Sequence, residues 1–201
     1  MKRAPRLLGA VLAGGEGRRF GGRKAEAPVG GVPMVERAVR TVREVVEDVV
    51  VVSSRPLGAL PVPTVPDRIE GAGPLGGLDA ALRHARSLAC DGVLLVACDL
   101  PMLTTAVLRR VAAALGDHPA VAPERRLGGV EPLCAAYRVE ALEAVERHLG
   151  RSARSLQALF AEIGGTVLPA AKLDAGDTLF NVNTPEERES AEAMLSRRGE
   201  R

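Results

Sequence analysis

Apolar positions along the chain follow two alternating patterns. Continuous apolar runs rich in β-branched residues predict buried strands, and apolar residues spaced three or four apart predict the helices that cover them. Strands that are apolar along their whole length are typical of a parallel sheet buried on both faces. The first half of the chain predicts strands at 7–13, 48–54, 62–67 and 91–101, and helices at 32–46, 74–89 and 104–115.

The second half is less regular. Short strands around a glycine turn are expected within 120–138, followed by helices at 139–149 and 152–162 and a strand at 165–170. Thr184, followed by Pro185 and two glutamates, predicts the start of a final helix. We therefore expect an α/β fold, a three-layer Rossmann-like and mostly parallel sheet with helices on both faces. One domain of residues 1–201 is expected, with halves at 1–120 and 121–201.

The composition argues against two kinds of partner, nucleic acids and membranes. The chain has 201 residues, a formal net charge of +2, no Trp, one Tyr and three Phe. So small a charge and so few aromatic rings argue against a nucleic-acid partner. No apolar run reaches the ~18 residues that a membrane span needs, so no membrane partner is expected. Three cysteines, Cys90, Cys98 and Cys134, show no disulfide or metal spacing and indicate a reducing compartment, so a cytoplasmic protein is expected.

The loop after the first predicted strand combines glycine with positive charge. Without Cβ atoms, the backbone at Gly14 and Gly15 can approach a phosphate or base closely. The spacing is not that of a Walker loop, because Ala25 stands where Ser or Thr would follow the lysine. The combination suits a polyphosphate, although the same charges also fit the rim of a solvated loop. The cations are Arg18, Arg19, Arg23 and Lys24.

Polar residues at strand ends are the other candidates. Asp99 follows an apolar run, and a carboxylate there suits Mg²⁺, which favours one or two carboxylates plus substrate phosphates. Asp67 ends a short strand before a glycine-rich turn containing Gly73, at the start of a helix. Asn181 and Asn183 alternate, which predicts a strand with both amides on one side. Each also fits a simpler role in a turn or a helix cap.

Five segments together resemble a known family. "LAGGEGRRFGGRK" is similar to the signature LAGGxSxRMGxDK of nucleotidyltransferases that activate a phosphorylated small molecule with an NTP. "PDRIEGAGPLGGL" and "LLVACDLPML" resemble the family's acidic residue with its GPLGG-type turn and its metal-binding strand end. "EPLCAAYR" and "FNVNTPEE" resemble its C-terminal half. The whole pattern is most similar to the molybdenum cofactor guanylyltransferase (MobA) family.

The resemblance implies transfer of GMP from GTP to the phosphate of molybdopterin, with release of pyrophosphate and Mg²⁺ as cofactor. It also implies partner proteins that take over the finished cofactor. Residues 1–120 would bind the nucleotide and residues 121–201 the acceptor. The implied catalytic residues are Lys24, Arg19 and Asp99, with Asp99 also the metal ligand; the implied nucleotide contacts are Leu12, Ala13, Gly14, Gly15, Lys24, Asp67, Gly73 and Asp99; the implied acceptor contacts are Asn181 and Asn183.

The chain departs from the family pattern in the first loop. Gly17, Phe20 and Arg23 replace the usual Ser, Met and acid, and "KAEAPVGG" is more polar than the family's apolar "KALLPLGG" type. Two other functions stay open. One is a CTP-dependent cytidylyltransferase acting on molybdopterin or another phosphorylated small molecule. The other is a nucleotide-binding protein without catalysis.

Overall fold

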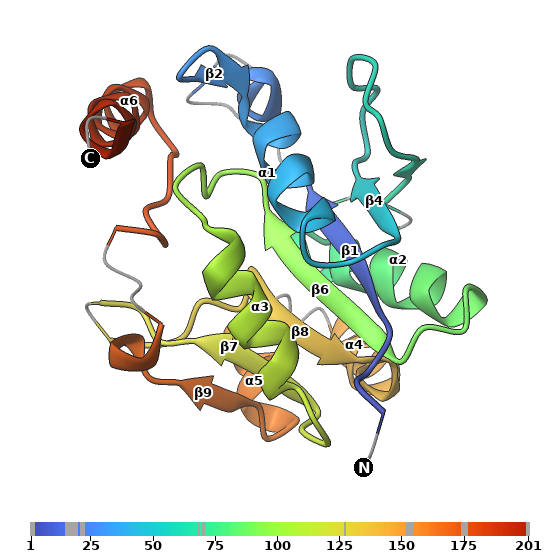
Figure 1. The fold of residues 1–201 in the computed structure, drawn as a ribbon. Coiled ribbons are helices and arrows are strands. Elements are labelled where there is room, and N and C mark those ends of the chain that lie inside the picture. Colours follow the sequence, from blue (N-terminus) through green and yellow to red (C-terminus); the bar gives the residue numbers. More distant parts are fainter. Residues whose placement is uncertain are drawn as a thin grey trace.

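A seven-stranded sheet forms the centre of the molecule (Figure 1). The computed structural model describes residues 3–14, 20, 23–67, 69, 71–126, 128–151, 155–173 and 177–199. The strand order is β5-β4-β1-β6-β8-β7-β9, and β8 alone runs antiparallel to its neighbours. The strands are β1 (Leu7–Leu12), β4 (Val49–Val52), β5 (Thr64–Val65), β6 (Gly92–Ala97), β7 (Ala120–Pro123), β8 (Cys134–Arg138) and β9 (Thr166–Leu168).

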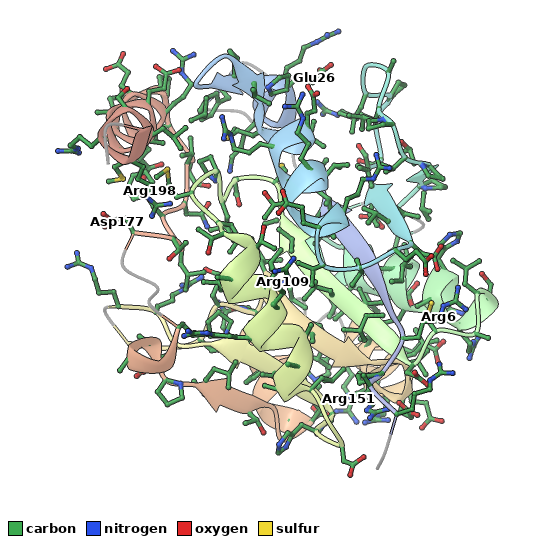
Figure 2. All side chains as sticks on the ribbon, viewed as in Figure 1. Arg6, Glu26, Arg109, Arg151, Asp177 and Arg198 are labelled. Carbon is green, nitrogen blue, oxygen red and sulfur yellow. The ribbon has the colours of Figure 1, made fainter. Side chains whose placement is uncertain are left out.

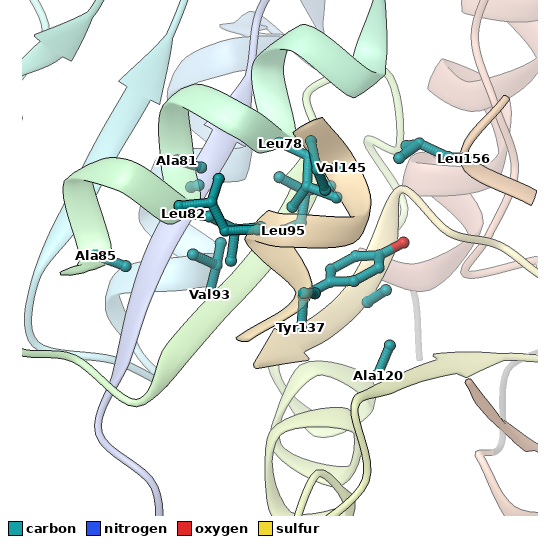
Figure 3. Close-up of a cluster of buried hydrophobic side chains, with 14 of the residues drawn as sticks. Leu78, Ala81, Leu82, Ala85, Val93, Leu95, Ala120, Tyr137, Val145 and Leu156 are labelled. Atoms are coloured by element: carbon teal, nitrogen blue, oxygen red, sulfur yellow. The ribbon is translucent and has the colours of Figure 1, made fainter. Parts of the chain in front are cut away.

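Helices cover both faces of this sheet, so the predicted three-layer α/β fold is confirmed. Helices α1 (Met34–Arg43) and α3 (Thr105–Ala114) pack on one face. On the other face lie α2 (Pro74–Ser87), α4 (Leu142–Gly150) and α5 (Leu156–Glu162). Figure 3 shows the second core, where α2, α4 and α5 meet the apolar side chains of the strands around the fully buried Tyr137.

The central strands β1, β4 and β6 have no polar side chain because they are covered on both sides. Every residue of β1 and β6 is buried, which explains their continuous apolar runs. Gly9 interrupts the run in β1 for a packing reason: a Cβ there would lie 2.4 Å from Cγ1 of Val42 on α1. The absence of that atom lets α1 pack close to the sheet.

Element boundaries differ from the prediction where short local structures intervene. The helix expected at 32–46 begins only at Met34, because the preceding residues form a hairpin of β2 (Pro28–Val29) and β3 (Val32–Pro33). Gly30 and Gly31 turn this hairpin with positive φ angles of 59° and 74°. The strand expected at 91–101 ends at Ala97, which places Asp99 in the turn that follows.

The last helix, α6 (Pro185–Gly199), returns the chain to the N-terminal half. It packs beside the β2–β3 hairpin (Figure 1), and Arg198 Nη1 donates to the backbone oxygen of Met102 at 3.0 Å. A third apolar cluster fills this junction, formed by Val29, Met34, Met102, Val182 and Ala191. The junction brings residues 181–183 to the end of the sheet that carries Asp99.

Two further expectations can be compared with the structure. Cys90, Cys98 and Cys134 are buried and form no disulfide. None of the helices in the described part of the chain combines the length and apolar character needed to cross a bilayer.

Gly92, at the start of β6, gives a test of this sheet. A Cβ there would lie 2.3 Å from the backbone oxygen of Tyr137 on β8, which a side-chain movement cannot relieve. We expect Gly92→Ala to lower the free energy of unfolding by about 3 kcal/mol, measured by urea denaturation. Gly150→Ala is the matched control, since a Cβ at Gly150 meets nothing within 4 Å, and it should change stability by less than about 1 kcal/mol. Equal stability of both variants would contradict the register of β6 against β8.

Candidate functional site

The candidate site lies at the carboxyl ends of four parallel strands, β5, β4, β1 and β6. Backbone hydrogen bonds carry the pairing beyond the strands: Cys98 N donates to Leu12 O at 3.0 Å, and Ala13 N donates to Val52 O at 2.9 Å. The turn after β6 and the loop after β1 are therefore held side by side. In open α/β sheets this edge is where ligands bind.

Lys24 and Asp99 form the centre of the site. Lys24 begins the short 3₁₀ helix η2 (Lys24–Glu26), and its Nζ lies 2.6 Å from Oδ2 of Asp99. The same Nζ donates to Oδ1 of Asn183 at 2.8 Å. The side chains of Lys24 and Asp99 are only 19% and 17% exposed, so solvent screens their attraction weakly. Three segments far apart in the sequence thus meet at one ammonium group.

The segment that carries Asn181 and Asn183 is not a strand, so that prediction was wrong. Residues 181–183 are irregular, and Val182 N donates to the backbone oxygen of Asp99 at 2.9 Å. The two amides still lie together, because Asn183 Nδ2 donates to Asn181 Oδ1 at 3.4 Å. Glu187 at the start of α6 accepts from Thr184 N at 3.0 Å, which confirms the predicted helix start.

Asp67 and Gly73 lie at the N-terminus of α2. Gly73 is the N-cap residue and has a φ of 62°, a conformation that favours glycine. Asp67 Oδ1 accepts from Ile69 N at 3.1 Å, and burial raises the pKa of this carboxyl. A Cβ on Gly76 would lie 2.8 Å from Asp67 Oδ1. Gly73 is therefore explained by its backbone conformation and Gly76 by close packing, apart from any contact that either residue makes with a ligand.

Beside the Lys24–Asp99 pair lies a hollow of about 370 Å³, within the range of small-molecule sites. One wall is the segment Arg23–Glu26, and the other is the loop after β4. Ala13 lines the hollow, and Gly14 follows it along the chain. A Cβ on Gly14 would meet nothing within 4 Å, so the space beside this residue is open. The lining residues are Ala13, Arg23, Lys24, Ala25, Glu26, Ser53, Arg55, Pro56 and Leu57.

The arrangement at Asp99 fits a cation that takes most of its ligands from elsewhere. Asp99 Oδ1 is buried and has no hydrogen-bond partner among the described residues. Within the same residues, no group of three or more His, Cys, Asp or Glu side chains could hold a metal ion. One carboxylate without further protein ligands suits Mg²⁺, which commonly keeps water and substrate phosphates in its shell.

The cysteine beside Asp99 is not a nucleophile. Burial raises the pKa of Cys98 to about 12, so its thiol stays protonated near neutral pH. We therefore give the Cys98 thiol no chemical role in the site.

The structure brings together some of the predicted residues. Lys24 contacts both Asp99 and Asn183. Leu12 lies next to this group, because its backbone oxygen accepts from Cys98 N, and Ala13 follows Leu12 along the chain. Gly15 and Arg19 lie outside the described residues. Sequence reasoning missed the hollow and its lining residues Glu26, Ser53 and Arg55. The polar "KAEAP" in place of an apolar family segment was the signal that could have identified Glu26.

Comparisons with known proteins show the family of this chain. A model of the MobA-like NTP transferase domain matches residues 9–166. The molybdenum cofactor guanylyltransferase of Desulfosudis oleivorans is 36% identical over 196 residues, which cover 94% of this chain and 96% of that protein. Molybdopterin-guanine dinucleotide biosynthesis protein A from Archaeoglobus fulgidus superposes with a TM-score of 0.79 at 27% identity, covering 95% of this chain and 100% of that one.

The fold also occurs in an enzyme whose name gives it as a cytidylyltransferase. The 2-C-methyl-D-erythritol 4-phosphate cytidylyltransferase from Thermus thermophilus superposes with a TM-score of 0.69 at 18% identity, covering 95% of this chain and 99% of that one. At that identity the likeness concerns the fold alone.

The Lys24–Asp99 pair can be tested by its contribution to stability. We expect Lys24→Met to lower the free energy of unfolding by about 1–2 kcal/mol, because it leaves a largely buried carboxylate unpaired. The double variant Lys24→Met/Asp99→Asn should recover part of the loss. Arg40→Met is the control: its pair with Glu36 is exposed and joins neighbouring turns of α1, so it should cost less than about 0.5 kcal/mol. A Lys24→Met protein as stable as the parent in urea would show that the pair does not form in solution.

Proposed function

Because this chain belongs to the MobA-like NTP transferase family, we propose that it transfers GMP from GTP to the phosphate of molybdopterin and releases pyrophosphate. The family makes it a nucleotidyltransferase, and the name of its Desulfosudis oleivorans relative supports the choice of GTP and of the molybdenum cofactor. The single observation that carries the proposal is the contact of Lys24 with both Asp99 and Asn183.

In the proposed reaction, an oxygen of the molybdopterin phosphate attacks the α-phosphorus of GTP. A new P–O bond forms, the bond to the β-phosphate oxygen breaks, and its electron pair leaves with pyrophosphate. The attacking oxygen is already anionic, so no side chain has to remove a proton. Catalysis then consists of positioning the two substrates and stabilising negative charge.

Each part of the site has a role in this proposal. The backbone at Leu12–Gly15 would face the nucleotide, and Gly14 leaves room for close approach. Lys24 would turn from Asp99 toward the phosphates and, with Arg19, stabilise the leaving pyrophosphate. Asp67 and Gly73 would contact the nucleotide at the N-terminus of α2. The linked amides of Asn181 and Asn183 would hold the acceptor beside Lys24.

We propose Mg²⁺ as the metal and Asp99 as its protein ligand. The buried, unpartnered Oδ1 of Asp99 supports this choice. When bound, the ion would neutralise charge on the substrate phosphates. Two contacts hold Asp99 in place: the Lys24 ammonium lies 2.6 Å from Oδ2, and the Val182 N–H donates to the backbone oxygen.

A cytidylyltransferase is the second candidate, and the fold shared with the Thermus thermophilus enzyme is the observation that keeps it open. Purified protein incubated with molybdopterin, Mg²⁺ and either GTP or CTP separates the two. Pyrophosphate release with GTP supports the proposal, release with CTP alone supports the second candidate, and binding without release with either supports a protein without catalysis.

Asp99→Asn tests the site itself. We expect it to lower the rate of pyrophosphate release from GTP by about a hundredfold or more, because it removes the charge that would hold the metal. Asp91→Asn is the matched control: Asp91 precedes the same strand at the opposite end of the sheet, where it accepts from Arg6 N at 2.6 Å. It should keep nearly the full rate. An Asp99→Asn protein as fast as the control would remove Asp99 from the mechanism.

A further inference from the structure

We propose that Glu26, which stands where the family pattern has an apolar residue, strengthens the selectivity of the nucleotide pocket for guanine by accepting hydrogen bonds from the ring N1–H and the exocyclic amino group of the base. This inference rests on the proposed function and adds to it a residue that distinguishes GTP from other nucleotides. It concerns the hollow beside Lys24, whose walls are the segment Arg23–Glu26 and the loop after β4.

Glu26 lies two residues after Lys24, at the end of η2. Figure 2 labels it at the end of the molecule that carries β2 and the loop after β4. Its carboxylate reaches toward that loop, where Gly58 N donates to Oε1 at 3.4 Å. The carboxylate therefore lies at the wall of the hollow, while the Lys24 ammonium lies beside the metal ligand Asp99.

The charge of Glu26 is unusual in its surroundings. Among the described residues that line the hollow, it is the only acidic one, and Arg23, Lys24 and Arg55 are basic. A carboxylate repels a triphosphate, so it does not help to bind that part of a nucleotide. It suits a part of the ligand that offers hydrogen-bond donors, and in a nucleoside triphosphate that part is the base.

The existing contacts of Glu26 leave acceptor capacity for a ligand. The bond from Gly58 N is long, at 3.4 Å. The ion pair with Arg23 spans 3.5 Å, and the Arg23 side chain is 83% exposed, so this pair contributes little. An ionised carboxylate has about four lone-pair sites. Both oxygens of Glu26 can therefore accept further hydrogen bonds.

Guanine matches this carboxylate better than the other bases do. Its N1–H and 2-amino groups are adjacent donors that can bind the two oxygens of one carboxylate as a pair. Cytosine and adenine each offer one amino donor, at N4 and N6, and the ring nitrogen next to it is an acceptor, so neither base can give both oxygens of one carboxylate a pair of adjacent donors. Paired hydrogen bonds to an ionised group are strong, and a pocket built for them rejects a ligand that lacks them.

The test compares nucleotides that differ at this edge. Isothermal titration with Mg²⁺ and GTP, ITP, ATP or CTP is carried out on the parent protein, Glu26→Gln and Glu26→Leu. ITP has the same edge as GTP without the 2-amino group. We expect the parent to bind GTP about ten- to a hundredfold more tightly than ITP, and Glu26→Leu to reduce this ratio to about threefold or less. Glu36→Gln, at a half-buried position on α1 that does not line the hollow, is the matched control and should leave the ratio unchanged.

The ratio of the affinities for GTP and ITP distinguishes recognition of the base by Glu26 from a purely structural role. If Glu26 only closed the wall through Gly58, both variants would weaken all four nucleotides by the same factor, and that result would overturn the inference. An unchanged preference for GTP in Glu26→Leu would overturn it as well, while leaving the proposed function in place. A parent protein that binds none of the four nucleotides would remove the proposed function and this inference together. Melting temperatures of the variants confirm that each is folded.

Discussion

The pairing of β1 with β6 is the constraint on which the site depends. The two strands run in parallel from Leu7 beside Gly92 to Leu12 beside Ala97, and Cys98 N extends the pairing to Leu12 O. This last hydrogen bond fixes the turn after β6 next to the loop after β1. Asp99 follows directly, so its carboxylate stands within reach of a side chain from that loop. Lys24 binds Asp99 from that loop, and Asn183 from the C-terminal segment accepts a hydrogen bond from the same ammonium group.

The parts of the fold that could be predicted are those in which burial determines the local sequence pattern. A strand covered on both faces has no position for a polar residue, so the sequences of β1, β4 and β6 contain no polar side chain. Asp99 was recognisable for the same reason, because a carboxylate ends one of these runs. Thr184, Pro185 and Glu187 likewise marked the start of α6 through short-range capping.

The rest depends on contacts that no local pattern carries. Asn183 meets Lys24 across 159 residues of chain, and the meeting requires α6 to pack beside the β2–β3 hairpin. The alternation at Asn181 and Asn183 predicted a strand, but Val182 bonds to the turn at Asp99 and not to a neighbouring strand. The contact of Glu26 with Gly58 likewise depends on the loop after β4, whose conformation follows no period in the sequence.

The Lys24 ammonium is a built-in counter-ion of Asp99. It satisfies one oxygen of Asp99, so the carboxylate attracts an incoming dication less than a free one would. Under the proposed function, a metal ion that arrived alone would have to displace the Lys24 ammonium from Asp99. A triphosphate would offer that ammonium other anionic oxygens, so the lysine could change partners when metal and nucleotide entered together. This charge balance would then favour uptake of the pair over uptake of either ion alone.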